Sequence, residues 1–370
     1  MLKNYFYFRG IIHFMTLQAS FTKKTFHFNF TARTSRGRMN DRTSWFIKIW
    51  DEERPELFGV GECAPLRGLS LDDKPDFEGI VKGVTEKIPS LELNSRSLLH
   101  DASVLVPSGY PSVVFGLETA LLDLKNGGKR IIFNNSFIQS KPIPINGLVW
   151  MGDLDVMLQQ ASIKIEEGFR CIKIKVGGLN FEKECDIIHY IRKKYFRENI
   201  EIRLDANGAF KPEEALYKLY DLSKYNIHSI EQPVKPGRPE MEELCRKSPI
   251  PIALDEELIG VDRPEDRRNL LERIKPQFII LKPSLIGGIQ SSQDWISVAE
   301  SLGIGWWITS ALESNIGLNA ICQLAANYPI TIPQGLGTGL LYDDNFQSPL
   351  EIVKGEIFFN PKLTWELSEL

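Results

Sequence analysis

Three lysines and three carboxylates stand at the ends of short apolar segments between residues 173 and 282 of this 370-residue chain. In chain order they are Lys173, Lys175, Asp205, Glu231, Asp255 and Lys282. The three acids are 26 and 24 positions apart, about the length of one strand followed by one helix. Parallel barrels gather the carboxyl ends of their strands on one face, where barrel enzymes keep their active sites. The spacing therefore predicts a shared site with one carboxylate from each of three strands.

Asp205, Glu231 and Asp255 are the candidate metal ligands. The chain has five histidines, and none has metal-ligand spacing. His228 precedes Glu231, and we interpret it as a surface or core residue. A site built from carboxylate oxygens alone suits a hard divalent cation. We therefore predict Mg²⁺, with Mn²⁺ as a substitute cation.

The lysines indicate proton abstraction next to a carboxylate. A lysine titrates near pH 10.4, so a base near pH 7 needs a pKa lowered by about three units. Lys173, Lys282 and the cation would lower the pKa of Lys175 by like-charge repulsion. The cation would also stabilise the enolate left by the proton. Neither a GxSxG elbow nor a useful Cys/His pair is present, which argues against nucleophilic catalysis.

Short apolar runs alternate with amphipathic helical patterns from about residue 143, as expected for a parallel sheet wrapped by helices. Eight such units favour a closed barrel over residues 136–345. Alternate strand residues face inward, which would place the lysines and acids on the interior. The expected strands are 143–148, 171–176, 200–205, 229–231, 252–255, 278–282, 306–309 and 331–334.

An α+β module is expected before the barrel, over residues 16–135. Its strands come first, separated by a polar loop at 33–42, and a turn-rich connection at 61–70 leads to its helices. The segment 346–370 is strand-like and is expected to return to this module. Residues 1–15 lack a signal-peptide pattern, and we interpret them as a non-conserved leader, with Met1 or Met15 as the start.

The composition describes a globular protein with 43% hydrophobic residues, 25% charged residues and a net charge of −4. This balance favours a small-molecule substrate and gives no indication of a nucleic acid or membrane partner. The five cysteines are scattered without a CxxC pair, so a cytoplasmic location is expected. No apolar run approaches the roughly 18 residues of a membrane span. Nothing in the sequence defines an oligomeric state.

The chain resembles the enolase superfamily, muconate lactonizing enzyme subgroup. The resemblance rests on the Lys-x-Lys pair at 173–175, the three acids and the later Lys282, and it spans most of the chain. It implies a modified (β/α)₇β TIM-like barrel with an α+β capping domain. The segments 33–42 and 61–70 would cover the site.

Within that subgroup the chain most resembles the o-succinylbenzoate synthase family, through segments beginning at Gly61, Ile143, Ser310 and Gln334. The resemblance implies a lyase of menaquinone biosynthesis. The reaction would be Mg²⁺-dependent syn-dehydration of 2-succinyl-6-hydroxy-2,4-cyclohexadiene-1-carboxylate to 2-succinylbenzoate. It further implies the following roles. Lys175 would take the α proton and then protonate the leaving hydroxide, and Lys282 would stabilise the intermediate from the opposite side. Arg203, Asn207 and Ser310 would support the site or bind substrate.

Related activities remain alternatives. N-succinylamino acid racemases share almost every site residue with the synthases. Dipeptide epimerases carry an Asp-x-Asp pair that residues 310–313 lack, and muconate cycloisomerase fits the capping segments less well. A non-catalytic barrel, in contrast, would be expected to have lost a ligand or a lysine, and none is lost.

Overall fold

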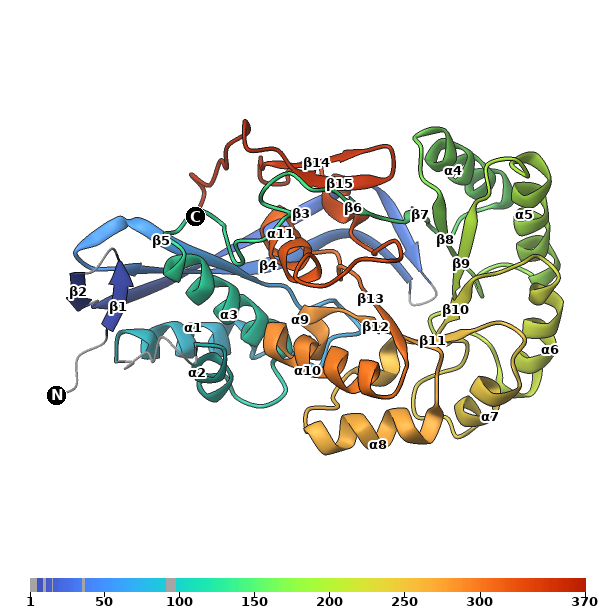
Figure 1. Cartoon of the computed structure of the whole chain (residues 1–370), viewed down its shortest axis with the longest axis horizontal. Coiled ribbons are helices and arrows are strands. Elements are labelled where there is room, and N and C mark those ends of the chain that lie inside the picture. The colour runs from blue at the N-terminus through green and yellow to red at the C-terminus, as the bar shows by residue number, and fades with distance from the viewer. Residues whose placement is uncertain (1–4, 9–10, 15, 35–36, 91–97) are drawn as a thin grey trace.

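Three long antiparallel strands dominate the N-terminal part of the computed structural model, which describes residues 5–8, 11–14, 16–34, 37–90 and 98–370. They are β3 (Leu17–Thr34), β4 (Gly37–Asp51) and β5 (Arg54–Cys63), and they form one sheet in chain order. Helices cover one face of this sheet (Figure 1). They are α1 (Phe77–Lys87), η1 (Ile88–Ser90), α2 (Leu98–Leu105) and α3 (Pro111–Lys125).

Strand β5 and helix α3 approach each other closely because glycines face glycines. A Cβ atom at Gly61 would overlap the carbonyl oxygen of Gly116, and a Cβ at Gly116 would overlap the sulfur of Cys63. The close approach buries the apolar residues of α3, among them Val113 and Leu117. The expected α+β module therefore has its strands and helices packed in contact.

A parallel sheet of seven strands follows, in the order β13-β12-β11-β10-β9-β8-β7, and it curls into a barrel. Its strands are β7 (Gly147–Val149), β8 (Cys171–Lys175), β9 (Glu201–Asp205), β10 (Ser229–Glu231), β11 (Ile252–Leu254), β12 (Phe278–Leu281) and β13 (Gly305–Ile308). The connecting helices are α4 (Leu154–Glu166), α5 (Phe181–Lys194), α6 (Pro212–Ser223), α7 (Glu240–Lys247), α8 (Pro264–Ile274), α9 (Pro283–Ile286), α10 (Gly288–Ser301) and α11 (Asn315–Ala325). Short 3₁₀ turns η2 (Glu256–Leu258) and η3 (Gly337–Leu340) complete the barrel.

The eighth strand expected in the barrel is replaced by two isolated β-bridges. The predicted strand at 331–334 is wrong, because this segment makes only isolated parallel bridges, Ile145 with Gln334 and Thr309 with Gly335. These bridges link the two ends of the seven-stranded sheet. The apolar run at 330–333 is broken by Pro333, which has no N–H to donate to a sheet ladder.

The C-terminal residues form a hairpin of β14 (Leu350–Val353) and β15 (Glu356–Phe359), and β15 also pairs with β6 (Ile143–Pro144). Beyond the hairpin, the chain contacts the first sheet. Lys24 Nζ lies 2.5 Å from Glu369 Oε2, and Lys48 Nζ donates to the Leu370 carbonyl oxygen at 2.9 Å. These contacts connect the two ends of the described chain.

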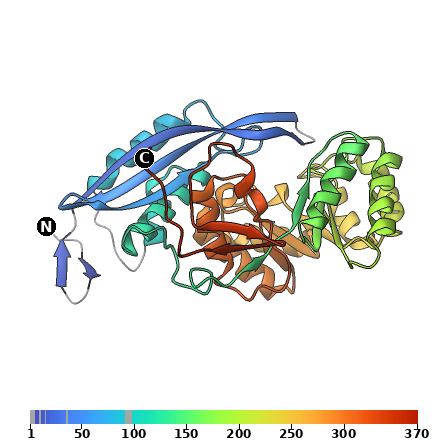
Figure 2. The same ribbon diagram turned by 90° about the horizontal axis from the view of Figure 1, so that it is seen from above.

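The predicted loop at 33–42 is largely strand. β3 and β4 continue as a twisted ribbon to Thr34 and from Gly37, with a register shift between His27 and Ala32. Polar residues on a two-stranded ribbon resemble a loop in sequence, which explains the error. Figure 2 shows the ribbon extending to the side of the barrel that carries α4, and Met151 N donates to the Arg33 carbonyl oxygen at 3.3 Å.

One further boundary differs from the sequence prediction. The first three residues of the expected connection at 61–70 belong to β5. Within the expected leader, residues 5–8 and 11–14 pair as an antiparallel hairpin, β1 (Tyr5–Phe8) with β2 (Ile11–Phe14). Met1 and Met15, the two expected starts, lie outside the described residues. Among the described helices, none has the length and apolar character that crossing a membrane requires.

Candidate active site

The barrel strands bring all six predicted site residues together in register. Lys175 lies opposite Asp205 across β8 and β9, and Asp205 lies opposite Glu231 across β9 and β10. Asp255 and Lys282 follow directly after β11 and β12. Because all these strands are parallel, the six side chains emerge on the same face of the barrel, as the spacing predicted.

The lysine amines lie against the carboxylates. Lys173 Nζ is 2.9 Å from Asp205 Oδ2 and also donates to Glu231 Oε2. Lys175 Nζ is 2.7 Å from the same Asp205 oxygen, and Lys282 Nζ donates to Asp255 Oδ2. The lysines and acids are buried, so these ion pairs are little screened by water.

The two lysines of β8 have different electrostatic environments. Burial lowers the pKa of Lys175; the Asp205 carboxylate opposes this shift, and the ammonium groups of Lys173 and Lys282 reinforce it. Burial alone would also lower the pKa of Lys173, but Asp205 and Glu231 outweigh it and raise that pKa. Lys175 is thus the easier of the pair to deprotonate, in the direction that the sequence predicted.

The three acids offer a donor set that fits a hard divalent cation. Glu231 Oε1 is buried without a hydrogen-bond partner among the described residues, so one carboxylate oxygen is available. Burial raises the pKa of Glu231 to about 7. In the described part of the chain, no three His, Cys, Asp or Glu side chains are already arranged to hold a metal ion. The amines of Lys173 and Lys282 instead contact these acids, so a metal would have to replace part of those contacts.

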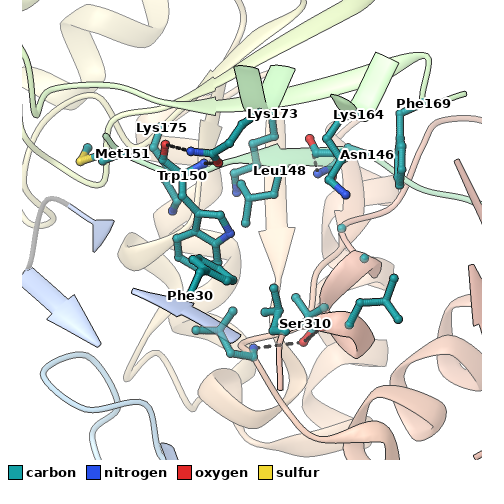
Figure 3. Close-up of a pocket in the computed structure, with 18 of the residues that line it drawn as sticks. Phe30, Asn146, Leu148, Trp150, Met151, Lys164, Phe169, Lys173, Lys175 and Ser310 are labelled. Atoms are coloured by element: carbon teal, nitrogen blue, oxygen red, sulfur yellow. Dashed lines mark hydrogen bonds between the residues drawn. The ribbon is translucent and has the colours of Figure 1, made fainter. Parts of the chain in front are cut away.

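A cavity of about 990 Å³ lies between Ser310 on one side and Lys173 and Lys175 on the other (Figure 3). Lys173, Lys175 and Lys282 line it, while Ser310 lies across the cavity from Lys173 and Lys175. The rings of Phe30 and Trp150 pack together along one side with their centroids 5.4 Å apart. The cavity is therefore charged on one wall and partly aromatic on another, which suits a substrate with a carboxylate and a ring.

The N-terminal strands contribute directly to this cavity. Phe30, Arg33 and Met39 from the β3–β4 ribbon line it, as does Leu66 from the connection after β5. Residues from both segments that were expected to cover the site are therefore part of its wall. The sequence prediction placed them there by resemblance, although it treated the first segment as a loop.

The three predicted supporting residues lie in different places. Asn207 contacts Lys175, with its Oδ1 2.9 Å from Nζ, so it orients this lysine and does not line the cavity. Ser310 lines the cavity. Arg203 is fully buried on the barrel interior, where it pairs with Glu201 at 2.7 Å and lies over the Trp307 ring. Arg203 therefore does not line the cavity, and its charge is paired inside the barrel.

Two cavity residues were missed by the sequence analysis. The Thr309 hydroxyl and the Asn146 Oδ1 atom are buried, and neither has a hydrogen-bond partner among the described residues. Buried polar atoms of this kind are costly unless a ligand or water satisfies them. The only sequence signal was a polar residue inside or just after an apolar strand, which also occurs at ordinary turns.

Comparison with known proteins agrees with this fold. Residues 156–362 match the family described as enolase C-terminal domain-like, and the chain belongs to this family. Enzymes of the enolase superfamily depend on a divalent metal ion. A curated o-succinylbenzoate synthase from Desulfotalea psychrophila is 40% identical over 364 residues, covering 92% of this chain and 98% of the relative.

Solved structures confirm the fold class. MenC from Desulfotalea psychrophila has a TM-score of 0.78 at 38% identity, covering 93% of this chain and 99% of that chain. A muconate lactonizing enzyme from Pseudomonas fluorescens, in complex with muconolactone, has a TM-score of 0.80 at 21% identity, covering 96% and 98%. The latter similarity concerns the fold alone. The expected enolase-like barrel with an α+β capping domain is therefore confirmed.

Proposed function

We propose that this chain is an o-succinylbenzoate synthase, a lyase that dehydrates 2-succinyl-6-hydroxy-2,4-cyclohexadiene-1-carboxylate to 2-succinylbenzoate in menaquinone biosynthesis. One observation carries the proposal: Lys175 and Lys282 emerge from β8 and from the end of β12 into one cavity. The 40% identity to a synthase over almost the whole chain supports the same reaction.

Lys175 is the base of the proposed reaction. Its neutral amine removes the proton next to the substrate carboxylate, and the resulting ammonium returns a proton to the hydroxyl group that leaves on the same face. The net products are 2-succinylbenzoate and water. Lys282 provides positive charge for the intermediate and a cation for the ring to contact. Asn207 holds the Lys175 amine through its Oδ1.

Asp205, Glu231 and Asp255 are the proposed ligands of Mg²⁺, with Mn²⁺ as a substitute. When bound, the cation would neutralise the negative charge that develops on the substrate carboxylate. The available oxygen of Glu231 supports this assignment.

We also propose a division of the chain into three parts. Residues 16–135 form the capping domain, 136–345 the barrel domain, and 346–370 a segment that returns to the cap. The contact of Lys24 with Glu369 supports the last assignment.

N-succinylamino acid racemisation is the second candidate. Proton removal and return on opposite faces requires two acid–base groups at one cavity, and Lys175 and Lys282, from different strands, both line this cavity. Purified enzyme should be assayed with the cyclohexadiene substrate and with N-succinyl amino acids, each with Mg²⁺ and with EDTA. Metal-dependent formation of the aromatic product supports the synthase, whereas racemisation without dehydration would replace the named reaction.

A further inference from the structure

The segment after β13, residues 310–314, has a conformation that its own sequence does not favour. Ser310, Ala311 and Leu312 line the cavity. Leu312 has φ of 70°, the left-handed region that a branched apolar residue rarely adopts. Such a conformation persists only where the surrounding structure holds it. We call residues 310–314 the cavity wall.

Barrel residues hold the cavity wall from within. Both oxygens of the buried Glu313 are used: Oε2 accepts from the Ser310 hydroxyl and from Ala311 N, each at 2.7 Å, and Oε1 accepts from the Ser284 hydroxyl. The Ser310 oxygen accepts from Leu312 N at 3.0 Å and from the Thr338 hydroxyl at 2.8 Å. Because a hydroxyl has one proton, Ser310 has none left to donate to a substrate in this arrangement.

Two charged residues of the N-terminal sheet hold the same wall from the other side. Arg42 on β4 donates to the carbonyl oxygens of Ala311 and Ala64, and thereby joins the wall to the end of β5. Glu62 on β5 accepts from the main-chain N–H of Ser314 at 3.0 Å and from its hydroxyl at 2.6 Å. Arg42 and Glu62 are both buried, and neither lines the cavity.

The remaining contacts of Glu62 complete an anion site at the start of α11. Its Oε1 accepts from the Ser44 hydroxyl at 2.7 Å, and its Oε2 accepts from Gly317 N at 3.0 Å. A Cβ atom at Gly317 would lie 2.8 Å from that oxygen, so the glycine admits the carboxylate. A negative charge at a helix N-terminus is stabilised by the unpaired N–H groups there. Glu62 therefore fixes both the cavity wall and the helix that follows it.

We propose that Glu62 and Arg42 are positioning residues that set the substrate-binding wall of the cavity from the capping side. They act through residues 310–314, since neither reaches the cavity itself. This inference rests on the proposed function for its choice of ligand. Disturbing them would displace the wall and weaken binding of the substrate and product, while Lys175 and its partners on β8 and β9 would remain in place. The expected effect is therefore on KM and on product affinity more than on kcat.

The test compares Glu62→Gln with Glu118→Gln. Glu118 on α3 is a matched control, because it is also fully buried and accepts from the N-terminal N–H groups of a barrel helix, those of Ile289 and Gln290 in α10. It does not line the cavity or contact its wall. Kinetic constants for the cyclohexadiene substrate are measured with Mg²⁺, together with the Kd of 2-succinylbenzoate by calorimetry and the melting temperature.

We expect Glu62→Gln to raise KM and Kd about tenfold or more and to change kcat by less than about threefold. Glu118→Gln should leave KM, Kd and kcat within about twofold of the wild-type values. If Glu62→Gln does not fold, Ser44→Ala removes one donor to Glu62 and should raise KM and Kd by about twofold to fourfold. The inference is overturned if the folded Glu62 or Ser44 variant binds product as the wild type does, or if Glu118→Gln shows the same loss. An inactive wild-type enzyme would instead contradict the proposed function.

Discussion

Lys175 and Asp205 face each other across neighbouring strands, with Nζ 2.7 Å from Oδ2. The same carboxylate oxygen also lies 2.9 Å from Lys173 Nζ, so Asp205 connects both lysines of β8. Burial alone would raise the pKa of Asp205, but the lysines hold it well below its usual range. Asp205 is therefore ionised across the physiological pH range. It links the proposed base to the proposed metal ligands.

Replacing a metal ligand should both lower turnover and raise the Mg²⁺ concentration that the enzyme needs. For Asp205→Asn, Glu231→Gln and Asp255→Asn we expect turnover to fall by about a hundredfold or more, with a higher Mg²⁺ concentration needed for half-maximal rate. A Mg²⁺ titration of initial rates measures both effects.

Asp72→Asn is the matched control for these variants, because Asp72 is a buried carboxylate that contacts Ser112 in the N-terminal module. Its Mg²⁺ dependence should equal that of the wild type. Ligand variants with wild-type Mg²⁺ titrations would contradict the assignment of the metal site.

The contact between β5 and α3 should be intolerant of added volume. Gly61→Ala introduces a methyl group that overlaps the Gly116 carbonyl oxygen. The atoms that the methyl group would meet belong to the main chain of α3. The overlap therefore cannot be relieved without displacing the sheet or the helix. We expect a loss of about 3 kcal/mol in the free energy of unfolding, measured by denaturant titration. Gly79→Ala on α1 has open space around it and should be stable, so equal stability of the two variants would refute this account.

Glu118 should make the folded protein less stable as the pH rises. Burial raises its pKa from 4.5 to about 8, so the folded state retains a proton that the unfolded state has lost. This contribution to stability is complete below about pH 4.5 and is lost as the pH rises through about 8. Glu118→Gln, which imitates the protonated acid, should therefore be more stable than the wild type at pH 9, by on the order of 2 kcal/mol.

Thermal unfolding at pH 7 and pH 9 tests this prediction. Burial also raises the pKa of Asp72 and of Asp123 to about 6, so these groups titrate mostly below this range and act equally in both proteins. The stability lost between pH 7 and pH 9 should be smaller in Glu118→Gln than in the wild type. An identical loss in the two proteins would show that Glu118 is already ionised at pH 7 in the folded state.

The barrel and its charged residues were predictable because strand alternation is local. Once the apolar runs at 171–176 and 200–205 were assigned as strands, the inward positions of Lys173, Lys175 and Asp205 followed from the two-residue period. These features depend on near neighbours in the sequence, and the register of β8 with β9 confirms them.

Other features depend on contacts that no local pattern contains. Glu62 and Ser314 are 252 positions apart, and their hydrogen bonds form only when the N-terminal sheet docks on the barrel. The contact of Arg203 with the Trp307 ring depends in the same way on a distant strand. The 33–42 ribbon was misassigned because its strand residues are as polar as loop residues. Local sequence propensity does not describe such tertiary contacts.

The most direct test of the central claim is the turnover of 2-succinyl-6-hydroxy-2,4-cyclohexadiene-1-carboxylate by the wild type and by Lys175→Ala, at saturating Mg²⁺. Loss of the base should reduce kcat by at least about a thousandfold, while circular dichroism and the melting temperature show an intact fold. A Lys175→Ala enzyme that forms 2-succinylbenzoate at close to the wild-type rate would contradict the account.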